Sequence, residues 1–484
     1  MARIEKKLEK TKTLSIIEGS SYSFMDGFGL RYFNPYVIEL GKKLKDSSSI
    51  NYYIGLLTSI PSILSSLVQL FTFQAMEKYS RKKIVFLSVL LQALMWLPII
   101  GVGFFYYYKN LSSETSLMSL VIIYSLFALF GGFAGPAWNS WMRDIVSNER
   151  GNYFGKRNRI AGFIAMLCML AAGFILDYFR DTKIFYGFII LFTIAFIGRL
   201  ISSLLFLKHY EPKFKTEKKY YFSIFQFIKR MPNNNFGRFV IYHSLLIFAT
   251  SIAGPFFVVY TLKTLGFNYI QYTITILAST IISLLSMPLW GRFADKYGTL
   301  RTMKINARYI ALIPILWALT FFAIGKIDII YLVIMVCIIE IIGGSSWAGF
   351  SLSAGNFIYE AVSRERTSLC FAYFNLLSSI GVLLGAGIGG LVASKNFILL
   401  GLPSFIWIML ISAILRYSFH RIMINKLDEA REVLPYKKNF EKQLLTDTIR
   451  DTENIIKRSL SSISLRKFST YLDEQFRSRH HVSN

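Results

Sequence analysis

Long apolar stretches separated by short polar segments dominate the pattern along this chain. A helix needs about 20 mostly apolar residues to cross the ~30 Å hydrocarbon core of a membrane. Twelve stretches meet that length, so the pattern predicts an all-α membrane protein with 12 transmembrane helices. Their expected bounds are 15–40, 51–73, 84–108, 116–140, 160–179, 184–207, 238–262, 270–291, 303–325, 328–350, 370–394 and 397–420.

Composition narrows the class of protein further. Hydrophobic residues make up 54% of the 484 residues and charged residues only 17%, whereas soluble domains carry about 25% charged residues. This excludes a soluble enzyme and a disordered chain. The net charge of +26 comes from basic residues between the apolar stretches, which indicates a membrane protein and no nucleic-acid partner.

The distribution of basic residues predicts how the chain is oriented. If the N-terminus is cytoplasmic, the cytoplasmic segments before the C-terminal tail hold 29 Lys and Arg residues, against nine on the other side. Basic residues concentrate in cytoplasmic loops. We therefore expect a monomer in the lipid bilayer of the plasma membrane, multi-pass, with both termini cytoplasmic.

The spans group into two halves of six, joined by a basic connection. The expected segments are a cytoplasmic N-tail (1–13), an N-terminal six-helix bundle (14–207), a cytoplasmic linker (208–237), a C-terminal six-helix bundle (238–420) and a cytoplasmic C-tail (421–484).

An internal repeat relates the two halves. The matched pairs are Pro35 with Pro255, Glu77–Tyr79 with Asp295–Tyr297, Pro98 with Pro314, and Ser147–Arg150 with Ser363–Arg366, at offsets of 220, 218, 216 and 216 residues. Both halves have the same span parity, which predicts two pseudo-symmetric bundles related by an axis along the membrane normal. Such repeats place a substrate site near the midplane and alternate access to it by rocking. We also expect the prolines of spans one and seven to bend those helices at matched places.

Two loops carry a recognisable motif. Residues 291–301, GRFADKYGTLR, resemble the motif G-x-x-x-D-(R/K)-x-G-(R/K)-(R/K) of the major facilitator superfamily, which lies between spans two and three and again between spans eight and nine. Residues 73–83, FQAMEKYSRKK, hold the first place and keep the acid, the lysine and the basic pair but lack both glycines. The second copy has Thr299 and Leu300 where basic residues are usual.

The resemblance implies a latch at the cytoplasmic side that holds the outward-facing state. Acids near helix ends and basic residues of these loops would form it, since a carboxylate at a helix N-terminus gains ~0.3–1 kcal/mol. Gly298 would permit a positive φ in the tight turn. The alternative is that the charges only set topology and solubility. The residues expected in this latch are Glu77, Lys78, Gly291, Asp295, Lys296, Gly298, Arg301, Glu149, Arg150, Glu365 and Arg366.

Charged residues inside the spans mark the expected transport site, because an ionisable side chain at the bilayer centre costs ~2.5–3.5 kcal/mol. In span one, Asp26 belongs to a polar stripe with Glu18, Tyr22 and Asn34. Arg31 should lie ~140° around the helix from Asp26, at 100° per residue. Glu340 of span ten lies twelve residues beyond Asp328, or ~18 Å into the membrane.

These residues lead to a hypothesis about coupling. We expect Asp26 and Glu340 to be the carboxylates that couple transport to protons, and Arg31 and Arg199 to hold a charge partner or an anionic group. The alternative is a structural ion pair between spans, such as Arg31 with Glu340. The remaining residues expected to face the substrate are Asn34 and Asn139.

The chemistry that is absent from the sequence sets the class of function. No phosphate-binding loop, metal-ligand cluster or nucleophile–base pair is recognisable, so we expect no enzyme activity, no metal and no cofactor. The sequence predicts a secondary active transporter of a small organic solute, coupled to H⁺. Two alternatives stay open, namely multidrug or amphipathic-compound efflux by the same fold and a transport-inactive sensor or scaffold.

Overall fold

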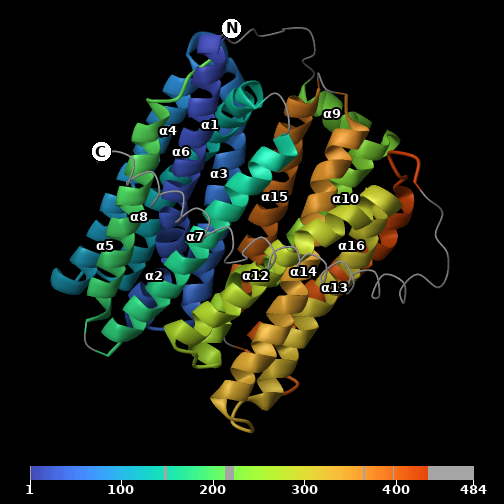
Figure 1. Cartoon of the computed structure of the whole chain (residues 1–484). Coiled ribbons are helices and arrows are strands. Elements are labelled where there is room, and N and C mark those ends of the chain that lie inside the picture. The colour runs from blue at the N-terminus through green and yellow to red at the C-terminus, as the bar shows by residue number, and fades with distance from the viewer. Residues whose placement is uncertain are drawn as a thin grey trace, which may run out of the picture.

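The computed structural model describes residues 2–146, 150–181, 183–212, 223–363, 366–395 and 397–433. Two helical bundles stand side by side, one coloured blue to green and the other yellow to red in Figure 1. The end of the molecule where α1 begins and α16 ends is called the terminal face here, and the opposite end is called the distal face.

The first bundle contains the six spans expected for the N-terminal half. Its elements are α1 (Ala2–Phe24), η1 (Met25–Gly29), η2 (Leu30–Tyr32), α2 (Phe33–Leu40), η3 (Gly41–Lys43), η4 (Ser47–Ser49), α3 (Ile50–Lys78), α4 (Arg81–Leu94), α5 (Trp96–Tyr108), α6 (Ser113–Ile145), α7 (Arg150–Phe179) and α8 (Ile184–Phe206). Elements α1 to α2 form span one, and α4 with α5 forms span three.

The second bundle repeats this plan after a short connecting helix. Its elements are α9 (Ile224–Arg230), η5 (Met231–Asn233), α10 (Asn235–Ala253), η6 (Gly254–Phe256), α11 (Phe257–Val259), η7 (Tyr260–Thr264), α12 (Tyr269–Tyr297), α13 (Thr299–Thr320), η8 (Phe321–Ala323), α14 (Ile329–Ala361), α15 (Thr367–Ala393), β1 (Ile398–Leu399), β2 (Leu402–Pro403), α16 (Ser404–Met423) and η9 (Ile424–Lys426). Elements α10 to η7 form span seven.

Eleven helices of the described chain are long and apolar enough to cross a membrane. The expected twelfth, span one, contains Glu18, Asp26 and Arg31 and breaks into α, π and 3₁₀ segments. Span twelve begins later than the expected residue 397, because residues 398–403 pair as a two-residue hairpin whose turn needs positive φ at Leu400 and Gly401.

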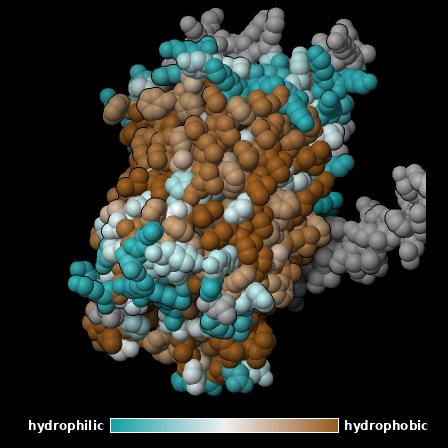
Figure 2. Space-filling view, turned by 90° about the vertical axis from the view of Figure 1, so that its left-hand side faces the viewer, coloured by the Kyte–Doolittle hydropathy of each residue, from teal (hydrophilic) through white to brown (hydrophobic). Residues whose placement is uncertain are grey.

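The surface matches a membrane protein. Figure 2 shows a broad hydrophobic belt across the middle of one face of the molecule, with hydrophilic residues gathered at the terminal face and a second hydrophilic group below the belt. Large apolar side chains on the membrane-length helices, such as Phe104, Ile122 and Phe174, are about half exposed. In water such a belt would be unstable, whereas lipid chains cover it without loss.

The irregular stretches of spans one and seven lie at corresponding places. Span one changes to a π turn and then a 3₁₀ turn before Pro35, and span seven has a 3₁₀ turn containing Pro255 followed by a π turn. Proline removes a backbone donor and disturbs the helical ladder. Both spans are therefore irregular beside the matched prolines, and the bend itself stays a prediction.

The seam between the bundles consists of α3 against α15 and α7 against α12 (Figure 1). At the distal face two hydrogen bonds join the bundles. Ser48 Oγ donates to the Ser394 carbonyl at 2.8 Å, and Asn51 Nδ2 donates to the Ala393 carbonyl at 3.2 Å. Toward the terminal face, the last inter-bundle hydrogen bond between described residues is Asn375 Nδ2 to Gln69 Oε1, at 3.1 Å.

Asp177 makes the most direct link across the distal seam. Its two carboxylate oxygens accept the backbone N–H groups of Tyr269 and Ile270, at 2.9 and 3.1 Å. Asp177 belongs to α7 of the first bundle, and these amides are the first two of α12 in the second. A carboxylate at a helix N-terminus satisfies orphan donors and complements the helix dipole. The contact therefore holds the distal face closed.

We expect Asp177→Asn to open the distal face more often, because the amide loses the charge and one acceptor. A loss of ~0.3–1 kcal/mol corresponds to a roughly two- to fivefold larger open population. The measurement is the rate of maleimide labelling at Ala393→Cys, which is 2% exposed, after subtraction of the parent chain's own labelling. Asp181→Asn, an exposed neighbour without such a contact, is the control. Equal labelling in both variants would contradict a closing role for Asp177.

Candidate functional site

The irregular turn of span one brings Asp26 and Arg31 together. Their side chains form an ion pair, with Arg31 Nη2 at 3.4 Å from Asp26 Oδ2. A π turn closes on the fifth residue, so positions five apart stack on one face. The expected separation of ~140° assumed a regular α-helix and is wrong for this segment. Such single π turns are frequent at functional sites.

Close packing accounts for the π turn. Gly27 lies against α7, where a Cβ would overlap the side chain of Cys168 and the carbonyl of Ala165. The Leu30 N–H is directed at the carbonyls of both Asp26 and Met25. Glycine allows this approach of the two backbones. The sequence of the turn, MDGFG, thus supplies both the small residue and the carboxylate.

The pair faces the space between the bundles and is not sealed off. The side chains of Asp26 and Arg31 are 22% and 43% exposed. The next residue, Tyr32, donates a hydrogen bond to the Met169 carbonyl of α7 at 2.7 Å and is hydrogen-bonded to Thr273 of α12 in the other bundle. A charged pair with open surface beside residues of both halves can meet a solute or a proton.

Asn34 and Asn139 differ in how they relate to this pair. Asn34 continues the same span and is half-buried, and its side chain makes no hydrogen bond within the described residues. Asn139 is exposed on α6, and the structure shows no contact between it and the pair. An amide without an internal partner is available to a ligand, so both remain candidates by position alone.

Glu340 lies on α14 without a cation. Its carboxylate faces Ser279 of α12 and Trp317 of α13. Within the described chain no Lys or Arg lies at ion-pair distance from it, so the alternative of an Arg31–Glu340 pair is not formed. Tyr272 of α12 lies within range of the charges of both Glu340 and Arg31.

Arg199 belongs to a buried network instead of open space. Its Nε donates to Gln92 Oε1 at 2.8 Å and its Nη1 to Ser202 Oγ at 3.3 Å. Ser202 in turn donates to Glu18 Oε1 at 2.8 Å. With 7% exposure, Arg199 is shielded from solvent. The structure thus separates it from the pair-forming Arg31, with which sequence reasoning had grouped it.

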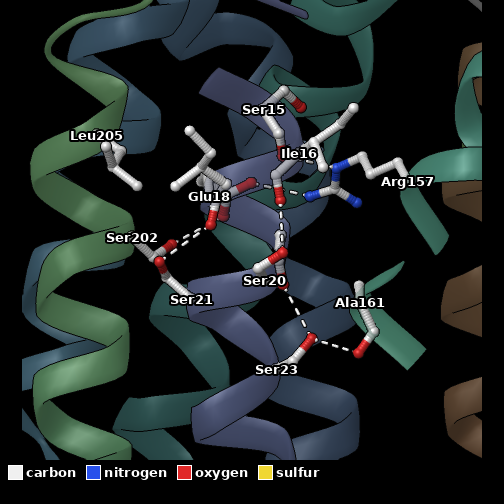
Figure 3. A network of polar contacts seen from close by, with 12 residues as sticks. Ser15, Ile16, Glu18, Ser20, Ser21, Ser23, Arg157, Ala161, Ser202 and Leu205 are labelled. Atoms are coloured by element: carbon white, nitrogen blue, oxygen red, sulfur yellow. Dashed lines mark hydrogen bonds and ion pairs between the residues drawn. The ribbon is translucent and has the colours of Figure 1, made fainter. Parts of the chain in front are cut away.

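Glu18 is the centre of this network, as Figure 3 shows. Its second oxygen accepts a hydrogen bond from Arg157 Nη2 at 2.9 Å, and the Nε of Arg157 donates to the Ser15 carbonyl at 3.0 Å. The Glu18 side chain is 4% exposed. One buried carboxylate therefore binds the guanidinium of Arg157 directly and is linked to that of Arg199 through the Ser202 hydroxyl.

Tyr22 connects the network to the open pair. The guanidinium carbon of Arg199 lies 5.0 Å from the centre of the Tyr22 ring, which is a cation–π distance. The charges of Asp26 and Arg31 also act on the Tyr22 hydroxyl. Span one therefore carries a continuous series of polar groups from near the terminal face to the bilayer centre.

The motif loops are only partly described. Gly298 has φ of 102°, which confirms the expected positive φ. Asp295 is 77% exposed on its side chain, and Lys296 lies over the Tyr297 ring at 5.0 Å. Glu77, Lys78 and Arg366 are exposed, while Gly291 and Arg301 are partly buried. Glu149, Glu365 and the side chain of Arg150 lie outside the described residues, so the latch stays a prediction.

Sequence reasoning missed most of the Glu18 network. Gln92, Arg157 and Ser202 come from three different helices, and no spacing along the chain relates them. The available signal was Glu18 itself, since a carboxylate in an otherwise apolar span needs a cation.

We expect Glu18→Gln to destabilise the fold by ~3–5 kcal/mol, because it leaves two buried guanidiniums without their carboxylate. The measurement is thermal or denaturant unfolding in detergent. Glu9→Gln is the matched control on the same helix, because the exposed Glu9–Lys12 pair contributes ~0–1 kcal/mol. An equal loss of stability in the two variants would contradict a special stabilising role for Glu18.

The chain was compared with known proteins. No curated protein matches it. Among solved structures, a mutant of the nucleoside transporter NupG has 16% identity and a TM-score of 0.64, covering 86% of this chain and 100% of the other. The xylose transporter XylE from E. coli, in a partially occluded inward-open conformation, has 12% identity and a TM-score of 0.59, covering 89% and 100%.

A bacterial homologue of the iron transporter ferroportin, in its inward-facing state, is also similar in fold, with 14% identity, a TM-score of 0.60 and coverage of 88% and 98%. At these identities the similarity shows the fold. The family itself is identified by sequence. The family described as Major Facilitator Superfamily matches residues 20–356, more than half of the chain, and the protein therefore belongs to the major facilitator superfamily of membrane transporters.

Proposed function

We propose that this protein is a secondary active transporter that moves a small organic solute by alternating access, driven by protons. The observation that carries the proposal is the contrast between two intramembrane carboxylates. Asp26 is paired with Arg31 beside open surface, whereas Glu340 has no cation among the described residues. Ionisable groups kept inside a membrane at this cost are functional sites by default.

The two carboxylates have complementary roles in this proposal. Glu340 takes up and releases H⁺, since none of the described residues gives it a cation that would hold it ionised. Arg31 binds an anionic or polar group of the solute, and Asp26 releases Arg31 when the solute arrives. Arg31 and Glu340 both influence the charge environment of Tyr272, and we propose that this residue links solute binding at Arg31 to proton binding at Glu340.

The seam supports an orientation for the described state. The distal face is closed by Asp177 and by the Ser48–Ser394 bond. The excess of basic residues in the loops at the terminal face supports a cytoplasmic orientation of that face. We infer that the structure is closed to the outside and that the site exchanges solute with the cytoplasm.

Transport by the purified protein in proteoliposomes tests the function. The first solute panel contains nucleosides and pentoses, because structural neighbours include carriers of nucleosides and xylose, together with amphipathic cations. With a transported solute, an imposed pH gradient should accelerate net uptake by wild type. No flux of any solute would instead favour the transport-inactive alternative.

We expect Glu340→Gln to abolish the acceleration by the pH gradient while solute exchange at equilibrium continues, because a neutral side chain cannot carry the proton. Asp26→Asn should weaken solute affinity or coupling through loss of the Arg31 pair. Asp328→Asn, an exposed carboxylate that precedes the same helix as Glu340, is the control. Unchanged proton dependence in both Glu340→Gln and Asp26→Asn would refute the coupling proposal.

A further inference from the structure

In the first motif loop, residues 73–83, one cation lies between two carboxylates and joins the ends of neighbouring helices. Arg81, the first residue of α4, is fully buried and its Nη1 lies 2.6 Å from Asp144 Oδ2 at the end of α6. Glu211, just after α8, accepts the backbone N–H of Arg81 at 2.7 Å and lies 3.7 Å from its Nε. A motif cation, a helix-capping acid and an acid of the neighbouring helix thus form one unit.

The second loop has two corresponding acids, Glu360 and Glu429, but a hydroxyl where the first loop has Arg81. Glu429 accepts the Leu300 N–H, with its two oxygens at 3.0 and 3.1 Å, and so caps α13 one residue further along than Glu211 caps α4. The offset of 218 residues between Glu211 and Glu429 is that of the repeat. Thr299 stands at the place of Arg81, and its hydroxyl is 2.9 Å from both Glu360 and Glu429. A hydroxyl has a single proton and no charge.

The missing cation comes from the tail. The guanidinium of Arg431 lies 3.4 Å from Glu360 Oε1 through its Nε. Its Nη2 donates to the carbonyls of Ala294 and Asp295, at 2.6 and 2.9 Å, in the last turn of α12. A cation at a helix C-terminus is favoured by the free carbonyls and the helix dipole. Arg431 therefore joins the ends of α12 and α14, and Glu429 adds the start of α13.

We propose that the tail segment 427–431 completes the second motif loop, with Arg431 in place of the basic residue that the loop lacks and Glu429 as the cap of α13. The C-terminal tail is then a positioning element that holds the terminal-face ends of α12, α13 and α14 as one rigid unit. In the first bundle the corresponding cation is built into the loop, so only the second bundle depends on its tail.

Hydrogen exchange of the full-length protein in lipid nanodiscs tests this proposal. In Arg431→Gln and Glu429→Gln, the backbone amides of residues 294–303 should exchange roughly tenfold faster, because charge-assisted hydrogen bonds are the stronger ones. Arg431→Lys should retain most of the protection. Arg421→Gln and Glu432→Gln, exposed residues without a contact to this loop in the described chain, should exchange as wild type does.

A rescue variant separates a replaced cation from general stabilisation. Thr299→Arg in the Arg431→Gln background puts a guanidinium between Glu360 and Glu429, as Arg81 stands between Asp144 and Glu211. It should restore protection at residues 294–303. Wild-type exchange in Arg431→Gln, or no restoration by either Thr299→Arg or Arg431→Lys, would overturn the proposal. The readout needs no solute, so its failure is distinct from failure of the transport proposal.

Discussion

A charge inside a membrane must be neutralised or given a use, and this constraint shapes the first bundle. Glu18 is buried, and two guanidiniums offset the cost of burying its charge. Arg157 binds the carboxylate directly, and Arg199 reaches it through Ser202. Each of those guanidiniums in turn has further acceptors, Ser15 for one and Gln92 for the other. Removing any member leaves another charge buried without compensation.

The same constraint gives the Asp26–Arg31 pair a different meaning. It is held by a single 3.4 Å contact and keeps open surface on both partners. Partly solvated ion pairs contribute little free energy and exchange partners readily. A carrier needs this property, because a site that neutralises itself too well cannot release its internal partner for a solute. The buried network is therefore the rigid part of span one, and the pair beyond Tyr22 is the exchangeable part.

The two halves share the same arrangement of helices but differ in the side chains that bind their motif loops. Both halves close their motif loop with an acid that caps the third span, but one uses Arg81 and the other borrows Arg431. A tail is free to vary while a loop between two packed helices is constrained on both sides. The second bundle therefore takes this contact from a residue beyond the last span.

The sequence alone determined the number and order of the spans, the repeat, the family and the presence of costly charges in spans one, six and ten. These follow from local hydrophobicity, spacing and motif residues, which act over one helix. Tertiary structure decided which charges meet. A π turn, set by packing of Gly27 on α7, placed Arg31 beside Asp26. Packing of α8 against α1 and α4 brings Arg199 into contact with Gln92 and, through Ser202, with Glu18. The tail after α16 places Arg431 beside Glu360. The partners Gln92 and Glu360 are far from Arg199 and Arg431 in the chain, and no local pattern encodes the packing that joins them.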